Sequence, residues 1–358
     1  MSALSESISQ RMTLGYLHSH YGLELVPSFA QDVTVTSLAD DLNSVRPGSL
    51  YLPYLGPGEE HVDLGTPPTQ PLQSAAEPIN DDTQYSQQTP TQEVEQVQAS
   101  SSSTESVSEP EGDQETSLDH LLVQAELRGA YAVLLPQSVK KAGIPQADIP
   151  LLIGDLEANE LGQILSNAAG GPSSALAIFA LVGQDASEQA EELAEFLHML
   201  GNPVGVLSAH KVSSLERSLD VQAPMSMFDV QRSLAICLED GAAAVVIAVD
   251  SATLQAQALQ SVQVDVIAFP KAASQRTHFY EGRRGRLTAA AREYGFALSS
   301  QMQVARPSDT TDEMAQQALA GKDQSRIDAL SLNIAMTLAA GVKRSHIRSA
   351  LETNQELS

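Results

Sequence analysis

Short, continuously apolar runs alternate with helical patterns along the second half of the chain, and this alternation limits the possible folds more than any other feature. A run that is apolar at every position is typical of a strand buried on both faces, as in a parallel sheet covered by helices on each side. The predicted strands are 151–153, 175–182, 204–207, 242–249 and 264–269, and the predicted helices are 157–167, 187–200, 228–239, 286–294, 323–340 and 344–351. The pattern therefore predicts a doubly wound, mostly parallel α/β domain over residues 151–358.

The first part of the chain combines a smaller α/β pattern with a long segment of different composition. Residues 57–117 are rich in Pro, Gln, Ser, Thr and Glu and have almost no aliphatic periodicity. Such a segment buries too little apolar surface to offset the entropy cost of ordering, so we expect a disordered insertion there. The sequence around it predicts a small mixed α/β domain over residues 1–150, with a helix that begins near residue 118 and strands at 33–38, 50–55 and 130–135.

The chain is strongly acidic, which excludes several kinds of partner. Its 358 residues carry 20 Lys and Arg against 45 Asp and Glu, a formal net charge of −25. Binding to nucleic acid or to an anionic membrane uses clustered Lys and Arg, so neither is expected as a partner. The sequence contains no run of about 18 apolar residues and no signal-peptide core, so we expect no membrane insertion and a cytoplasmic location.

The cysteine and histidine content argues against a metal site or a thiol nucleophile. The chain has a single cysteine, Cys237, within an apolar stretch, so an intrachain disulfide is impossible. An inert buried thiol is the expected state of such a residue. The histidines have no metal-ligand spacing, so no metal site is expected.

A predicted strand, turn and helix over residues 177–200 form the scaffold on which a phosphate-binding loop is normally built. Such a loop needs small residues that let backbone N–H groups approach the phosphates, a Lys, and a Ser or Thr hydroxyl that binds Mg²⁺. The turn here contains Gly183, Asp185, Ser187 and Glu188 and has no lysine. A carboxylate about 4 Å from a phosphate charge is repelled by about 1 to 4 kcal/mol, so this turn is not expected to hold ATP.

Ligands of a doubly wound sheet bind beyond the carboxyl ends of its strands. Segments 184–187, 250–251 and 270–275 follow three predicted strands, so we expect them to converge on one crevice. The polar residues of these segments include Asp185, Ser187, Asp250, Ser251 and Gln275, with His278 just beyond them.

These polar residues have two interpretations. Asp and Ser cap helix starts and turns, and Ser187 followed by Glu188 and Glu191 is the pattern of an ordinary helix start. Alternatively, the Asp and Ser side chains form a different polar site in the same crevice, with His278 as its base.

Two further motifs point to a known family. Residues 41–51 read DLNSVRPGSLY, similar to the pattern D-S-R-x-V-x-P-G-x-L-F, and residues 128–133 read RGAYAV, similar to a G-A-x-A-V strand. With residues 150–173 and the strand-turn-helix following in the same order, the chain resembles the N-terminal and central domains of the Mur ligases, nearest to the tripeptide synthetases. The family consists of ATP-dependent, amino-acid-adding enzymes of peptidoglycan synthesis. The resemblance implies a central domain of their phosphate-loop type.

The same resemblance identifies which functional residues of the family are replaced. The family's phosphate loop reads T-G-T-N-G-K-T-T. At the matching positions this chain has Ser187 in place of the lysine and Glu188 in place of a hydroxyl. Replacements also affect the uridine-contacting D-S-R motif, the glutamate that holds Mg²⁺, and the acidic positions of a later motif. The residues at these positions are Asp41, Leu42 and Asn43, then Ala248 followed by Asp250 and Ser251, then Gln275 and His278. The sequence ends where the family's third domain would begin, so we expect the C-terminal ligase domain to be absent.

A family scaffold with altered functional positions predicts a catalytically inactive protein that binds neither ATP nor Mg²⁺. We expect a binding, scaffold or regulatory factor in peptidoglycan synthesis or cell division, with a protein partner such as a true Mur ligase. Two alternatives remain open. One is an active ATP- and Mg²⁺-dependent UDP-N-acetylmuramoyl-peptide ligase with altered motifs, and the other is a sugar-nucleotide sensor without turnover.

Overall fold

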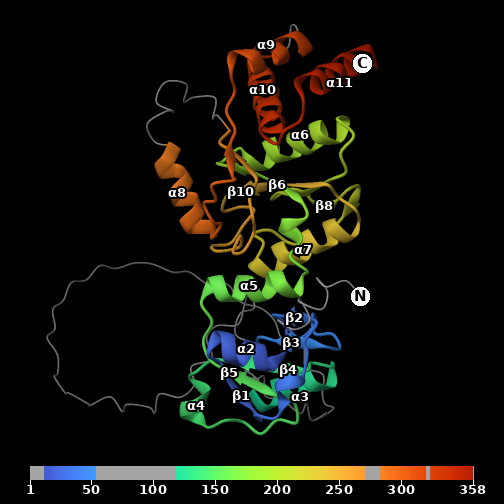
Figure 1. Ribbon diagram of the computed structural model, residues 1–358. Coiled ribbons are helices and arrows are strands. Elements are labelled where there is room, and N and C mark those ends of the chain that lie inside the picture. The colour runs from blue at the N-terminus through green and yellow to red at the C-terminus, as the bar shows by residue number, and fades with distance from the viewer. Residues whose placement is uncertain (1–11, 54–117, 271–282, 320–322, 358) are drawn as a thin grey trace, which may run out of the picture.

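The computed structural model describes residues 12–53, 118–270, 283–319 and 323–357. The insertion predicted at 57–117 lies outside these residues, as do Gln275 and His278. The described residues form two sheets with helices packed on them (Figure 1). Most neighbouring strands in both sheets are parallel, which confirms the predicted α/β class.

The first sheet is small and mixed. Its strands are β1 (Glu24–Val26), β2 (Ser37–Ala39), β3 (Ser49–Tyr51), β4 (Ala132–Leu135) and β5 (Leu151–Ile153), and the helices beside it are α2 (Leu14–Tyr21), α3 (Leu118–Leu127), α4 (Val139–Ala142) and α5 (Ala158–Ala168). The strand order is β1-β5-β4-β3-β2, with β1 antiparallel to β5 and the other pairs parallel. Apolar side chains of α2 and α5 pack on one face and those of α3 on the other. The sheet is therefore buried on both sides, as its apolar strands predict.

The second sheet is larger and carries the candidate site. Its strands are β6 (Ala177–Val182), β7 (Val204–Leu207), β8 (Val212–Ser214), β9 (Arg217–Ser218), β10 (Ala244–Val249), β11 (Val266–Ala268) and β12 (Gln303–Val304). Their order is β12-β11-β6-β10-β7-β8-β9. The first five strands in this order are parallel, whereas β8 and β9 form an antiparallel edge.

Helices cover both faces of the second sheet. They are α6 (Ala186–Met199), α7 (Met227–Glu239), α8 (Arg283–Tyr294), α9 (Asp309–Ala318), α10 (Gln324–Ala339) and α11 (Arg344–Leu357). Successive residues of β6 point to opposite faces, so Ile178 packs with α7 and α8 while Phe179 packs with α6 and α10. The sequence of β6 is apolar at every position because both faces are covered.

The two sheets meet through α5 and α7. Phe228 at the start of α7 is buried in the same apolar cluster as Leu161 and Ile164 of α5. Figure 1 shows α5 lying between the first sheet and the helices of the second. The packing places the end of β2 beside α7.

Several elements differ from the sequence predictions. The predicted strand at 33–38 is wrong over most of its length, because only Ser37–Ala39 pairs with β3. Strands β1, β8, β9 and β12 were not predicted, since two or three residues are too few to establish a period of two. Helix α9 was also missed, because its only buried residues are Thr311, Met314 and Ala315.

Candidate functional site

The carboxyl ends of three neighbouring strands form the centre of the candidate site. Strand β6 lies between β10 and β11, and Val182 at its end pairs with Val249 at the end of β10. The N–H of Gly183 donates to the carbonyl of Val249 at 3.3 Å, which holds the two strand ends together beyond the sheet. The predicted convergence of 184–187 and 250–251 is therefore present, whereas segment 271–275 lies outside the described residues.

A three-residue turn, 183–185, joins β6 to α6. Gly183 has φ +143°, a backbone conformation that residues with a Cβ rarely adopt. The N–H of Ala186 donates back to the carbonyl of Gly183 at 3.2 Å. A phosphate loop instead directs several backbone N–H groups at the anion. At Gly183 and Ala186 these donors bind carbonyls of the protein itself.

Ser187, at the position of the family lysine, is buried in the protein. Its Oγ lies 3.1 Å from Oγ1 of Thr253 and accepts the N–H of Ala209 at 3.2 Å. The prediction that Ser187 caps α6 is wrong, because Asp185 occupies the cap position and makes no side-chain capping bond. The Ser187 hydroxyl instead joins the first turn of α6 to the segments that follow β7 and β10.

The carboxylates of the site have different surroundings. Asp185 and Glu188 are exposed beside the turn. Asp250 accepts the N–H groups of Ala252 at 3.0 Å and Thr253 at 2.8 Å through Oδ1, which is a turn-forming arrangement. Ser251 is exposed beside it. These hydrogen bonds of Ser187 and Asp250 thus connect structural groups. His278, the base of the alternative polar site, lies outside the described residues, so that alternative stays a prediction.

A positive charge also lies at this crevice, and the sequence interpretation missed it. The guanidinium of Arg286 on α8 lies over the ring of Phe269, with Cζ 5.3 Å from the ring centre. A Cβ placed on Gly183 would be 3.9 Å from Nη2 of Arg286. The cation therefore approaches the turn from across the crevice and not from the start of α6. Thr253, also missed, follows Asp250 in a D-x-x-T pattern typical of a capped turn.

The residues at the uridine-motif position form a turn whose polar groups are bonded within the turn and to Arg128. Oδ1 of Asp41 accepts the N–H groups of Asn43 at 2.6 Å and Ser44 at 3.2 Å. Nη1 of Arg128 donates to the carbonyl of Leu42 at 2.6 Å and to Oδ1 of Asn43 at 3.0 Å. The carboxylate of Asp41 and the amide oxygen of Asn43 therefore have partners within the protein.

The neighbouring carboxyl, Asp40, is buried where β2 ends beside α7. Burial raises the pKa of Asp40, and the nearby charge of Asp229 acts in the same direction, whereas Arg232 opposes the change. Asp40 is the group of this region with the clearest cost of ionisation.

The thiol of Cys237 is buried on α7, as predicted. Burial raises its pKa to about 11, so the nucleophilic thiolate is scarce at neutral pH. Over the described ranges, no three His, Cys, Asp or Glu residues come together in a group that could hold a metal ion. Within the same ranges, every helix is too short or too polar to cross a bilayer.

The fold has counterparts among solved structures. One described as UDP-N-acetylmuramoyl-L-alanyl-D-glutamate–2,6-diaminopimelate ligase matches with a TM-score of 0.50 and 11% identity, over 97% of this chain and 67% of that chain. A crystal structure of MurF from Acinetobacter baumannii matches with a TM-score of 0.48 and 13% identity, over 94% and 66% of the two chains. This chain thus spans 66% to 67% of the length of these structures.

No protein-family model matches the sequence, and no curated protein does. At this level of identity the structural likeness concerns the fold. The fold resembles that of a Mur ligase, in agreement with the resemblance seen in the sequence motifs.

Proposed function

We propose that this chain is a catalytically inactive relative of the Mur ligases that acts as a binding, scaffold or regulatory factor in peptidoglycan synthesis or cell division. One observation carries the proposal: the side chain at the position of the phosphate-binding lysine, Ser187, is hydrogen-bonded to Thr253 and to the backbone of Ala209. A residue engaged in this way supplies no charge to a phosphate. The proposal places the protein in the cytoplasm with a protein partner, and a true Mur ligase is the first partner to test.

The charges around the turn support the same function. Asp185 and Glu188 are exposed there, and each carboxylate would repel a phosphate about 4 Å away by about 1 to 4 kcal/mol. The position of the Mg²⁺-binding glutamate is Ala248, which is fully buried in β10. Arg286 places one positive charge at the crevice, but a single guanidinium does not replace a set of directed N–H donors, a lysine and a metal ion.

The test is a titration of the full chain with ATP and Mg²⁺. Binding is measured by calorimetry and by the increase in the free energy of unfolding. A ligand at about 100 times its dissociation constant stabilises the native state by about 2.7 kcal/mol, so micromolar binding is easily detected. We expect no stabilisation at millimolar ATP and no Mg²⁺-dependent hydrolysis. An active Mur ligase with an intact T-G-T-N-G-K-T-T loop is the positive control.

The same titration separates the proposal from its alternatives. Micromolar binding of ATP with hydrolysis would contradict the proposal and identify an active ligase with altered motifs. Binding of UDP-N-acetylmuramoyl-dipeptide without binding of ATP would identify a sugar-nucleotide sensor. We expect neither result, and for the dipeptide ligand the reason is that Asp41 is already bonded within its own turn and Asn43 to Arg128.

A further inference from the structure

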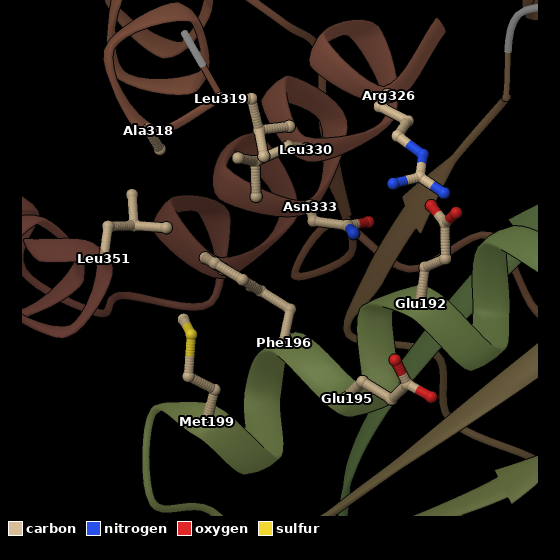
Figure 2. A pocket seen from close by; sticks show the side chains of 10 residues that line it. All are labelled: Glu192, Glu195, Phe196, Met199, Ala318, Leu319, Arg326, Leu330, Asn333 and Leu351. Carbon is tan, nitrogen blue, oxygen red and sulfur yellow. The ribbon is translucent and has the colours of Figure 1, made fainter. Parts of the chain in front are cut away.

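A groove lies on the second sheet's helical layer, away from the crevice. It is formed between α6, the end of α9, the first two thirds of α10 and the middle of α11. It has a volume of about 480 Å³ and is here named the α6–α10 groove (Figure 2). Ligand sites in proteins have volumes of about 300 to 1,000 Å³. Glu192, the lining residue of α6 nearest to the turn, is five residues beyond Ser187, about 7.5 Å along the helix axis, and neither Ser187 nor the turn 183–185 lines the groove. The groove is therefore separate from the altered phosphate turn.

The floor of the groove is apolar. It is formed by Phe196 and Met199 of α6, Leu330 of α10, Leu351 of α11, and Leu319 just after α9. Figure 2 shows these side chains directed toward one another from different helices. Phe196 and Leu351 are largely buried, whereas the other three are only partly buried. The floor thus continues the apolar cluster of these helices to the surface.

The rim of the groove is charged and mainly acidic. Glu192 and Glu195 lie one turn apart on α6, and Arg326 of α10 faces Glu192 across the groove. Partial burial raises the pKa of Glu192, and the carboxylates of Glu188 and Glu195 act in the same direction, whereas Arg326 opposes them. Two carboxylates against one guanidinium leave the rim with a negative charge that a cation would stabilise.

The two sides of the groove are held at a fixed separation. Nε2 of Gln189 on α6 donates to Oδ1 of Asn333 on α10 at 2.7 Å, and both side chains are buried. Asn333 also lines the groove. A hydrogen bond between buried amides fixes the distance between the helices, so the groove exists before any ligand arrives.

We propose that the α6–α10 groove binds a segment of a partner protein that inserts a large aliphatic or aromatic side chain and carries Lys or Arg beside it. An apolar floor with an acidic rim is the complement of such a segment, and an amphipathic helix laid into a groove is a common mode of recognition. The inference concerns binding at this surface and holds whether or not the chain turns over ATP.

Charge argues against two occupants from this chain, residues 54–117 and a second copy. Residues 54–117 contain 13 Asp and Glu and no Lys or Arg, so they would be repelled by Glu192 and Glu195. A second copy of the chain brings a further net charge of −25. A basic segment of another protein avoids both penalties.

The test selects peptides of about 16 residues, roughly 24 Å of helix, from a random display library on the full chain. Binders are depleted on Met199→Arg, which puts a bulky cation on the groove floor. We expect the remaining peptides to combine basic residues with Leu, Ile, Phe or Trp. The proposal is overturned if depletion removes no class of binder, or if the groove-dependent peptides are acidic or lack basic residues.

Affinity measurements then assign the contacts. By fluorescence anisotropy we expect Glu192→Gln with Glu195→Gln, and separately Phe196→Ala, to weaken binding about tenfold. Glu239→Gln, on α7 at the other face of the sheet, is the matched control and should bind as the wild type does. Replacing Lys and Arg of the peptide by Glu tests the same contact without changing the protein, and unchanged affinity there would refute the proposal.

Sedimentation of the full chain at about 1 to 100 μM tests whether a second copy of the chain occupies the groove. We expect no association that depends on the groove. A dimer that Met199→Arg abolishes would assign the groove to a second copy of this chain and overturn the proposal.

Discussion

Replacing Ser187 with alanine removes one hydroxyl and, with it, the bonds to Thr253 and to the backbone N–H of Ala209. Ser187 is 6% exposed and Thr253 is fully buried, so water replaces neither bond without rearrangement. A net contribution of about 0.5 to 1.5 kcal/mol for each bond predicts a loss of about 1 to 3 kcal/mol in the free energy of unfolding. The loss is measured by urea denaturation followed by circular dichroism.

A double-mutant cycle isolates the bond between the two hydroxyls. Thr253→Val removes the second hydroxyl with little change in volume, so the double variant should lose less than the sum of the single variants, by about 0.5 to 1.5 kcal/mol. Ser251→Ala is the matched control, because Ser251 is exposed in the same crevice and its loss should change stability by less than about 0.5 kcal/mol. If Ser187→Ala were as stable as the control, the hydroxyl would have no structural function and the proposal would lose its main support.

Three further predictions concern buried groups elsewhere. Because the folded pKa of Asp40 is raised above its ordinary value of 3.8, this carboxyl stabilises the fold only at low pH and loses that contribution as the pH rises through the folded pKa. Asp40→Asn should therefore raise the melting temperature at pH 7, and a gain of the same size at pH 4 would contradict this cause. With a pKa of about 11, Cys237 should react with a disulfide reagent at pH 8 far more slowly in the folded protein than in guanidinium, and equal rates would show that the thiol is accessible. A Cβ on Gly205 would lie 2.5 Å from Sγ of Cys237, so Gly205→Ala should lower the free energy of unfolding by about 1 to 3 kcal/mol, as measured by urea denaturation. Adding Cys237→Ala should recover part of that loss if the sulfur is the obstacle.

Local pattern is sufficient for the main architecture. Strands β6 and β10 are apolar at all six positions because helices cover both faces, and the prediction places each within two residues of its observed start. The adjacency of the turns after Val182 and Val249 was also predictable, since ligand sites of such sheets lie beyond the carboxyl ends of the strands. Burial on both faces makes every residue of a strand apolar, and this pattern is visible in a single sequence.

Contacts between distant segments produce no such local pattern in the sequence. Ser187 has the local pattern of a helix start, but its partner Thr253 is 66 residues away and becomes apparent only when β10 lies beside β6. Arg286 lies at the crevice because α8 packs on the face of the sheet to which Ile267 of β11 points. The polar sequence of α8 does not indicate this packing. The α6–α10 groove requires side chains from four helical segments. Pairing of that kind is decided by tertiary packing and not by the periodicity of any one element.

A phosphate loop and the turn observed here make opposite demands on the same groups. A working loop keeps N–H donors and a lysine available for the ligand, and each such group left unpaired in a buried place costs about 1 to 3 kcal/mol. In this chain the N–H groups of Gly183 and Ala186 and the hydroxyl of Ser187 already have partners inside the fold. A lysine in place of Ser187 would break both bonds of Ser187 and put an ammonium at a position that is 6% exposed, while Asp185 and Glu188 would still repel a phosphate. The partners of Ser187 therefore support the proposed non-catalytic function more strongly than the lack of a lysine does by itself, because they make a single substitution to lysine unfavourable.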